Sequence, residues 1–412
     1  MNLDKSETLA QNTDETTANL LVHGQGVFLF EAAPNTQEVS FSITNRSTQG
    51  YDVVVSRDNV CVINNVSGAV LTDSACEGGL VTTNGAYYWF SIDSHNQQFL
   101  FGVGEARIDT KKYIYRFNYT DEEKRKEQVL FMETLETIHY NKHITPLRML
   151  RDPIVHAVPM RVKNKNDLTM NDVGQYMFLP DACLNPVCKQ MYDCVSGDKF
   201  QLNTKGFPDF AEAIEYSINT PGCWCYETLR TKSTEFDKDH PNLNETYLRI
   251  TLGENDGDSP GIPYVMEIWP VGHYSPIHSH ANANAVIRVL SGNISVSLYP
   301  FLSGTKGESA PFADVVFFKD DITWITPHTN QVHQLKNLES NDKACVTIQC
   351  YTYSKQNNRH YDYFDYLDES GVIQQFFPDS DMDFTKFKQT IRTEWKNRPK
   401  TFTRYLFPFI CN

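Results

Sequence analysis

The sequence predicts a mainly β protein that contains two β domains joined by a helical segment. Short β-forming runs separated by Asn, Gly and Ser fill the first hundred residues, alternating apolar and polar runs recur between residues 264 and 351, and helical patterns are few. A chain of 412 residues can bury two hydrophobic cores. We expect a polar tail over residues 1–20, an antiparallel β-sandwich over 21–118, a helical linker over 119–181 and a second β domain over 182–412.

The N-terminal domain is predicted from five β-rich runs, at residues 27–30, 39–43, 51–55, 88–92 and 98–104. The tyrosines and tryptophan in these runs are expected to lie in the core. The aromatic strand that precedes Gly102-Val103-Gly104 resembles the small β domain named after farnesoic acid O-methyltransferase, over residues 27–117. That resemblance implies an accessory module, and no glycine-rich site for a methyl donor accompanies it.

Two helices are expected outside the first domain. Thr120 to Glu123 has the form of a helix capping box, and the run that follows could remain helical to Tyr140. Residues 142–181 carry prolines and mixed charge, which favours a packed linker. A second helix is predicted over residues 208–218, because Pro208 suits a first turn and Phe210, Ile214 and Ile218 share one face.

The second domain is predicted to be a β barrel. Residues 264–269 and 315–318 are rich in β-forming side chains, and apolar residues alternate with polar ones over 294–299 and 345–351. A closed antiparallel barrel of such strands would shield a central site and leave one mouth open for a small ligand.

Two histidines one residue apart, His278 and His280, are the strongest functional signal. Residues i and i+2 of a strand project from the same face, so both imidazoles can bind one metal ion. His333 could supply a third imidazole, and Gly272 and Gly292 flank the pair. A single histidine would more often be a surface or core residue, but this combination predicts a metal site for divalent iron, copper, zinc or nickel.

This pattern resembles the metal site of the cupins, whose barrel is a double-stranded β-helix. Many cupins place a carboxylate four or five residues after the second histidine, where this chain has Asn284 and Ala285. The expected ligands are therefore three histidines and no carboxylate.

Within the cupins, the surroundings resemble the iron thiol dioxygenases, above all cysteine dioxygenase. The resembling residues are Gly272–His280, Val289–Asn293, His333 and Asn337, and we extend the resemblance over residues 182–399 with a helical entry segment. It implies that His278, His280 and His333 hold Fe²⁺.

Two further elements resemble the substrate-binding residues of that family. Tyr247-x-Arg249 matches a Tyr-x-Arg element whose arginine binds the substrate carboxylate, a task that suits the planar guanidinium. Alone, it would more often be a surface salt bridge. On the predicted strand at 345–351, the family carries serine, histidine and tyrosine where this chain has Thr347, Gln349 and Tyr351. The tyrosine hydroxyl points at the substrate in the family, and a glutamine can relay a hydrogen bond but cannot titrate near neutrality.

A cysteine that some animal members crosslink to that tyrosine corresponds to Ala285, so we expect no crosslink here. The resemblance implies the dioxygenation of a small thiol, L-cysteine to cysteine sulfinic acid with O₂. One alternative is a dioxygenase of another small thiol such as 3-mercaptopropionate. The other is a non-catalytic cupin that binds a metal or ligand, which has no need of both Arg249 and Tyr351.

The composition suits an enzyme with small-molecule partners, the thiol and O₂. A formal net charge of −14 disfavours binding to nucleic acid or to an anionic membrane surface. No run of about 18 apolar residues, the length needed to span a membrane, is present. The polar N-terminal residues lack the charged and then apolar pattern of a signal peptide. We therefore expect a cytoplasmic protein whose ten cysteines are reduced thiols. The sequence does not determine the oligomeric state.

Overall fold

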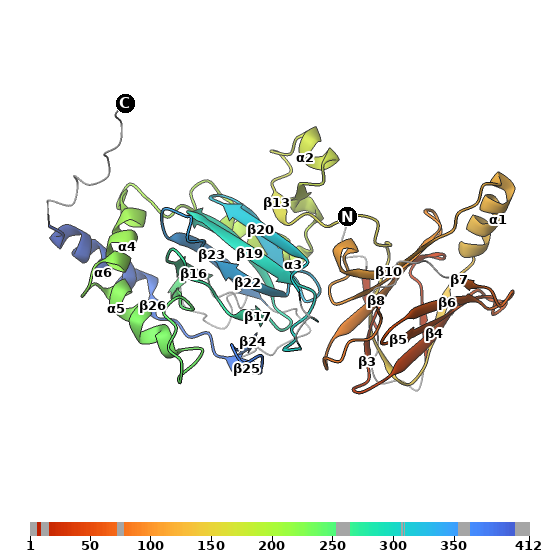
Figure 1. Ribbon diagram of the computed structural model, residues 1–412. Coiled ribbons are helices and arrows are strands. Elements are labelled where there is room, and N and C mark those ends of the chain that lie inside the picture. Colours follow the sequence, from red (N-terminus) through yellow and green to blue (C-terminus); the bar gives the residue numbers. More distant parts are fainter. Residues whose placement is uncertain are drawn as a thin grey trace, which may run out of the picture.

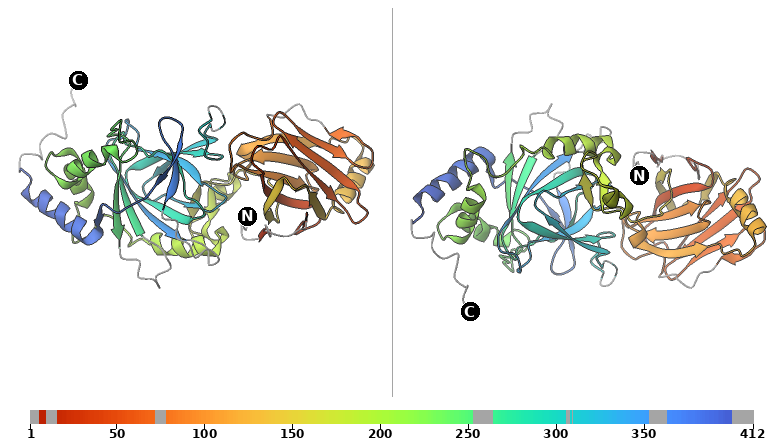
Figure 2. Two further views of the ribbon diagram at one scale, coloured as in Figure 1. Left: turned by 90° about the horizontal axis from the view of Figure 1, so that it is seen from below. Right: turned by 90° about the horizontal axis from the view of Figure 1, so that it is seen from above.

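The computed structural model describes residues 6–9, 16–71, 78–252, 264–305, 308, 310–352 and 363–399. The chain is mainly β, as predicted, and forms a β-sandwich followed by a β barrel (Figures 1 and 2). The two lie side by side in all three views. No helix in the described part is long and apolar enough to cross a membrane, and none of the cysteines described there forms a disulfide.

The sandwich consists of two antiparallel sheets of six strands each. In spatial order, the first contains β1 (Ser6–Thr8), β12 (Ile144–Leu150), β3 (Gln25–Ala32), β8 (Tyr87–Asp93), β9 (Gln98–Val103) and β10 (Lys111–Arg116). The second contains β2 (Thr17–Asn19), β11 (Thr137–Tyr140), β4 (Glu38–Thr44), β5 (Gly50–Ser56), β6 (Val60–Asn64) and β7 (Val70–Leu71). All five predicted runs form strands, and their phenylalanines and tyrosines fill the core between the sheets. Trp89 is also buried, in a separate cluster with Val27, Leu29, Leu100 and Ile154.

The sandwich extends beyond its predicted boundaries at both ends. β1 and β2 lie within the predicted polar tail, and β11 and β12 lie within the predicted linker. Ile138 of β11 is fully buried between Ala18 and Ile43, its partners on the neighbouring strands. These pairings are tertiary, so the short polar runs that form them give little local signal.

The first predicted helix is shorter than expected. α1 spans Glu122–Met132, and Asp121 rather than Thr120 is its N-cap, accepting hydrogen bonds from the backbone of Glu123 and Lys124. The helix stops before Thr137, where the alternation of strand β11 begins.

The barrel is formed by a sheet of eight strands and a sheet of six. The first contains, in order, β14 (Phe178–Pro180), β13 (Arg161–Lys163), β21 (Ile322–Ile325), β18 (Asn284–Ser291), β23 (Cys345–Thr352), β16 (Tyr264–Trp269), β15 (Leu248–Leu252) and β26 (Met382–Asp383). The second contains β20 (Ala313–Phe318), β19 (Asn293–Tyr299), β22 (Val332–Lys336), β17 (Ile277–Ser279), β24 (Phe364–Leu367) and β25 (Ile373–Phe376). Only the pairs β13–β14 and β15–β26 are parallel among these described strands.

Helices cover part of the eight-stranded sheet. They are α3 (Pro186–Val195), α4 (Phe210–Asn219), α5 (Trp224–Thr231) and α6 (Phe384–Asn397), and α2 (Met170–Gly174) lies near β13 and β14. α4 confirms the predicted helix, with Phe210 and Ile214 buried in the core. α4, α5 and α6 lie at the end of the barrel away from the sandwich (Figure 1).

Strand β23 shows the predicted alternation. Val346, Ile348 and Cys350 join the core under the helices, whereas Thr347, Gln349 and Tyr351 line a cavity inside the barrel. This strand therefore connects the packing of the domain with the interior site.

Candidate metal centre

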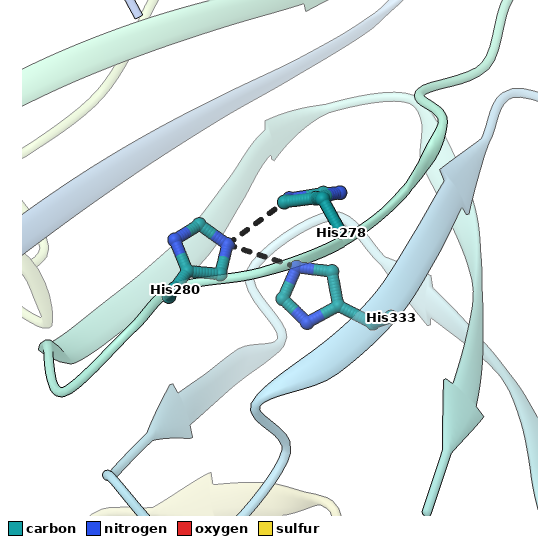
Figure 3. A group of neighbouring side chains, drawn as sticks. All are labelled: His278, His280 and His333. Carbon is teal, nitrogen blue, oxygen red and sulfur yellow. Dashed lines mark hydrogen bonds between the residues drawn. The ribbon is translucent and has the colours of Figure 1, made fainter. Parts of the chain in front are cut away.

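The three predicted histidines converge in the barrel. His278 lies in the middle of β17, directly paired with His333 of β22, and His280 follows the end of β17. The Nε2 atom of His280 lies 3.1 Å from the Nε2 atoms of both His278 and His333 (Figure 3). Among the residues that the structure describes, this is the one cluster of three or more His, Cys, Asp or Glu side chains close enough to hold a metal ion.

Hydrogen bonds orient two of the imidazoles toward the centre. His278 Nδ1 donates to the carbonyl of Pro276 at 3.0 Å, and His333 Nδ1 donates to the carbonyl of Asn330 at 3.0 Å. Their Nε2 atoms are then unprotonated, and the single Nε2–H that His280 could offer cannot serve both. These inward-facing lone pairs, more than one shared hydrogen could satisfy, fit a bound cation. Backbone carbonyls that accept from the outer ring nitrogen of a histidine commonly fix the tautomer that binds a metal.

Burial keeps the three side chains neutral, as metal ligands must be. Desolvation lowers the pKa of His278 to about 4 and that of His333 to about 3, and it lowers the pKa of His280 well below its usual value. Arg249 lowers the pKa of His278 and His280 further because its positive charge disfavours a second cation nearby.

The predicted substrate residues share one cavity with the histidines. Tyr247, Arg249 and Tyr351 line it, and its remaining walls are mostly apolar, as in many small-molecule sites. The Tyr247 ring stacks on Trp269 with ring centroids 4.2 Å apart, which fixes it beside Arg249. The structure thus brings together all six residues that the sequence singled out.

The predicted carboxylate receptor, Arg249, already has a carboxylate partner in this chain. Its Nη1 atom donates to Glu267 Oε1 at 3.0 Å, and both side chains are almost completely buried. Burial alone would lower the pKa of Arg249, but Glu267 raises it overall, so the guanidinium stays charged. Its Nε atom is buried without a hydrogen-bond partner among the described residues. Arg249 therefore keeps a donor for a further ligand.

Glu267 also begins a hydrogen-bonded chain to Tyr351. Its Oε2 atom accepts from the amide of Gln349, and the oxygen of that amide accepts from the hydroxyl of Tyr351. Burial raises the pKa of Glu267, and Arg249 and the Gln349 amide oppose the shift. The amide NH₂ of Gln349 faces Glu267, and the amide oxygen faces Tyr351. The Tyr351 hydroxyl thus donates to Gln349, where the sequence led us to expect donation toward the substrate.

Tyr351 stands next to the metal ligands. Its ring lies over the ring of His280 with centroids 5.4 Å apart, and Phe364 packs against His280 on another side. The residue directly opposite Tyr351 on β18 is Ala285. An alanine methyl has no sulfur with which to form a thioether, so the position across from the tyrosine cannot crosslink to it.

Sequence reasoning missed Glu267. It lies in the run Tyr264–Trp269, which the sequence identifies only as β-forming. The missed signal was a charged residue in the middle of an otherwise apolar strand, because such a residue needs a buried partner.

The flanking glycines have structural roles. Gly272 and Gly292 both have positive φ, +81° and +73°. Asn337 closes the first of these turns by accepting a hydrogen bond from Gly272 N and donating from its side chain to Trp269 O. These contacts hold the segment before the histidine pair against β22.

Comparison with known protein families finds a match in one part of the chain. Residues 235–363, less than a third of the chain, match the family model described as cysteine dioxygenase type I. That segment contains the three histidines, Tyr247, Arg249 and Tyr351.

Three solved structures that align with the chain do so over about a quarter of its length. One is the cupin domain of an XRE family transcriptional regulator from Enterobacter cloacae, with 14% identity, 26% of this chain and 98% of that chain covered, and a TM-score of 0.21. Another is a cupin superfamily protein from Desulfitobacterium hafniense, with 9% identity, coverages of 27% and 81%, and a TM-score of 0.20. A third, from Klebsiella pneumoniae, contains a double-stranded β-helix domain and has 17% identity, coverages of 27% and 76%, and a TM-score of 0.20.

Proposed function

We propose that this protein is an iron-dependent thiol dioxygenase that converts L-cysteine to cysteine sulfinic acid. The observation that carries the proposal is the convergence of three neutral imidazoles with Arg249 and Tyr351 in one buried cavity. The match of residues 235–363 to the cysteine dioxygenase family model supports the same reaction class. His278, His280 and His333 would hold Fe²⁺.

The reaction needs no further reductant. Both atoms of O₂ are added to the sulfur, so that R–SH and O₂ give R–SO₂H, and the sulfur loses the electrons that oxygen gains. When bound, ferrous iron would supply open coordination positions for sulfur and oxygen. The protein's own contribution is then to orient the thiol and to exclude water.

Arg249 and Glu267 would orient the amino-acid end of the substrate. The buried, unpartnered Nε of Arg249 suits a carboxylate, and the Glu267 carboxylate beside it suits an amine. A substrate with both groups adds no net charge to the buried pair. A thiol that has a carboxylate but no amine, such as 3-mercaptopropionate, would add one uncompensated negative charge.

Tyr351 would act on the same substrate through its oxygen. Its hydroxyl hydrogen is directed to Gln349, so we assign the phenol oxygen the role of accepting a hydrogen bond from the substrate amine. The chain through Gln349 and Glu267 fixes this orientation.

The proposal is tested by O₂ consumption and sulfinate formation in the iron-loaded protein. L-cysteine, cysteamine and 3-mercaptopropionate would be compared, with His280→Ala as the blank. We expect one sulfinate per O₂, fastest with L-cysteine and absent in the blank. Iron binding at one equivalent with no O₂ consumption from any thiol would contradict the proposal and favour a non-catalytic cupin.

A further inference from the structure

A buried ion pair of the β-sandwich lies against the barrel. Glu105 and Arg107 follow β9 and are 0% and 1% exposed, although they belong to a turn. Charged side chains are almost never buried to this extent unless they are paired or serve a specific site. Arg107 Nη1 lies 3.9 Å from Glu105 Oε2, so the pair compensates part of its own charge.

Both residues contact one loop of the barrel, which connects β21 to β22. Glu105 Oε1 accepts from the backbone N–H of Gln331 at 3.0 Å, and Arg107 Nη1 lies 3.4 Å from Asn330 Oδ1. Asn330 itself has a positive φ of +60°, a conformation that needs support from its surroundings.

The same two loop residues hold two of the three histidines. Gln331 Oε1 accepts from the backbone N–H of His280 at 3.2 Å, and the Asn330 carbonyl accepts from His333 Nδ1 at 3.0 Å. Gln331 Nε2 also donates to the carbonyls of Ala283, at 3.0 Å, and Thr326, at 2.7 Å. His280 is thus connected to Glu105 through Gln331. In the same way, His333 is connected to Arg107 through Asn330.

The interface around this pair leaves the sandwich little freedom to shift. Glu105 N donates to Pro300 O at 3.2 Å, and a Cβ on Gly104 would come within 2.0 Å of that same carbonyl. Phe301 of the barrel is part of the hydrophobic core of the sandwich. The position of the Glu105 carboxylate is therefore set by the packing of both domains.

We propose that Glu105 and Arg107 are positioning residues, through which the N-terminal β-sandwich sets the geometry of the metal ligands His280 and His333. The sandwich then contributes to the geometry of the metal site and is not only an accessory module. This inference rests on the metal site of the proposed function, and it is independent of the substrate.

The test is Co²⁺ binding to full-length protein, measured by the visible absorbance of the bound ion. Glu105→Ala removes the acceptor of Gln331 N, and we expect its Kd for Co²⁺ to rise about tenfold with a changed absorbance spectrum, since outer-shell partners commonly contribute 10–100-fold to metal affinity. Glu105→Gln keeps an acceptor oxygen, so we expect it to restore the wild-type spectrum. Gln331→Ala should weaken binding at least as much as Glu105→Ala.

A second contact between the two domains provides the matched control. Glu308 of the barrel accepts from Thr82 N at 2.8 Å and from Thr83 Oγ1 at 2.6 Å. Glu308→Gln should leave the Co²⁺ spectrum and Kd within twofold of wild type.

Three outcomes are decisive. An unchanged spectrum and Kd in Glu105→Ala would overturn the inference, even if the melting temperature falls. Equal effects of Glu105→Ala and Glu308→Gln would also overturn it, since general loosening of the interface would then suffice. Weakened Co²⁺ binding in Glu105→Ala alone would support it whether or not the wild-type iron protein oxidises any thiol.

Discussion

Arg249 and Glu267 are directly opposite each other on the antiparallel strands β15 and β16, and their side chains form a buried ion pair with Nη1 and Oε1 3.0 Å apart. Glu267 is in turn opposite Thr347 of β23, which places it beside the strand that carries Gln349 and Tyr351. Arg249, which we expect to bind a substrate carboxylate, is thus already paired with the carboxylate of Glu267. Selectivity among small thiols should depend on this pair.

Glu267→Gln tests that dependence. The substitution leaves Arg249 without a compensating charge, so a thiol that has a carboxylate but no amine should bind better. We expect the ratio of kcat/KM for 3-mercaptopropionate to that for L-cysteine to rise about tenfold, which corresponds to about 1.4 kcal/mol. Glu245→Gln is the control, because Glu245 is also buried but does not line the cavity. An unchanged ratio in Glu267→Gln would contradict the assigned role.

Gln349→His tests the hydrogen-bonded chain. A neutral imidazole at this position could accept from Tyr351 and donate to Glu267, but a protonated imidazole could no longer accept. We expect kcat/KM of the variant to fall as the pH drops below about 6.5, a transition that glutamine cannot produce in the wild type. The measurement is kcat/KM between pH 5.5 and 8. Identical profiles for the two proteins would show that this position does not control the chemistry.

Glu105 should make stability depend on pH. Burial raises its pKa to about 7, with Arg107 opposing the shift and Asp109 reinforcing it. The folded state then holds a proton that the unfolded state releases near pH 4.5, so the stabilisation is full below that pH and is lost as the pH rises through 7. Relative to Glu105→Gln, the wild type should lose about 2 kcal/mol of unfolding free energy between pH 5 and pH 8.

Denaturant unfolding at the two pH values measures this difference. Glu308→Gln is again the control, because hydrogen bonds from Thr82 and Thr83 outweigh burial and lower the pKa of Glu308, so the charge on Glu308 does not change over this range. A pH-independent difference between wild type and Glu105→Gln would contradict the raised pKa.

Much of the fold and site could be predicted because the signals are local. His278, Ser279 and His280 carry the two-residue period of a strand, and alternation placed Thr347, Gln349 and Tyr351 on the cavity side of β23. The predicted runs of the sandwich became strands for the same reason.

The rest could not be predicted because it depends on distant pairings. β11 becomes a strand only by pairing with β2 and β4, and β12 only by pairing with β1 and β3, so the local sequence there indicates a helix and linker instead. Glu105 and Arg107 have no distinctive local pattern, since their partners in the loop between β21 and β22 lie more than 200 residues away. The sequence shows Glu267 as a charged residue in an apolar run, but it does not show that Glu267 pairs with Arg249.

Gly292→Ala tests the turn after β18. Gly292 has a φ of +73°, and a Cβ there would lie 2.8 Å from Ala344 O. Gly68 has nearly the same φ, +71°, but open space around it, so Gly68→Ala measures the cost of the backbone conformation alone. We expect Gly292→Ala to lose at least about 1 kcal/mol more unfolding free energy than Gly68→Ala. Equal losses would show that the turn adjusts to the methyl group.

The proposed dioxygenation is tested by the fate of ¹⁸O₂ in the iron-loaded protein supplied with L-cysteine. A thiol dioxygenase must place both labelled atoms in the sulfinate, so mass spectrometry should find doubly labelled cysteine sulfinic acid, and none in the His280→Ala protein. Sulfinate with one labelled atom or none, or cystine formed with hydrogen peroxide in its place, would contradict a thiol dioxygenase reaction.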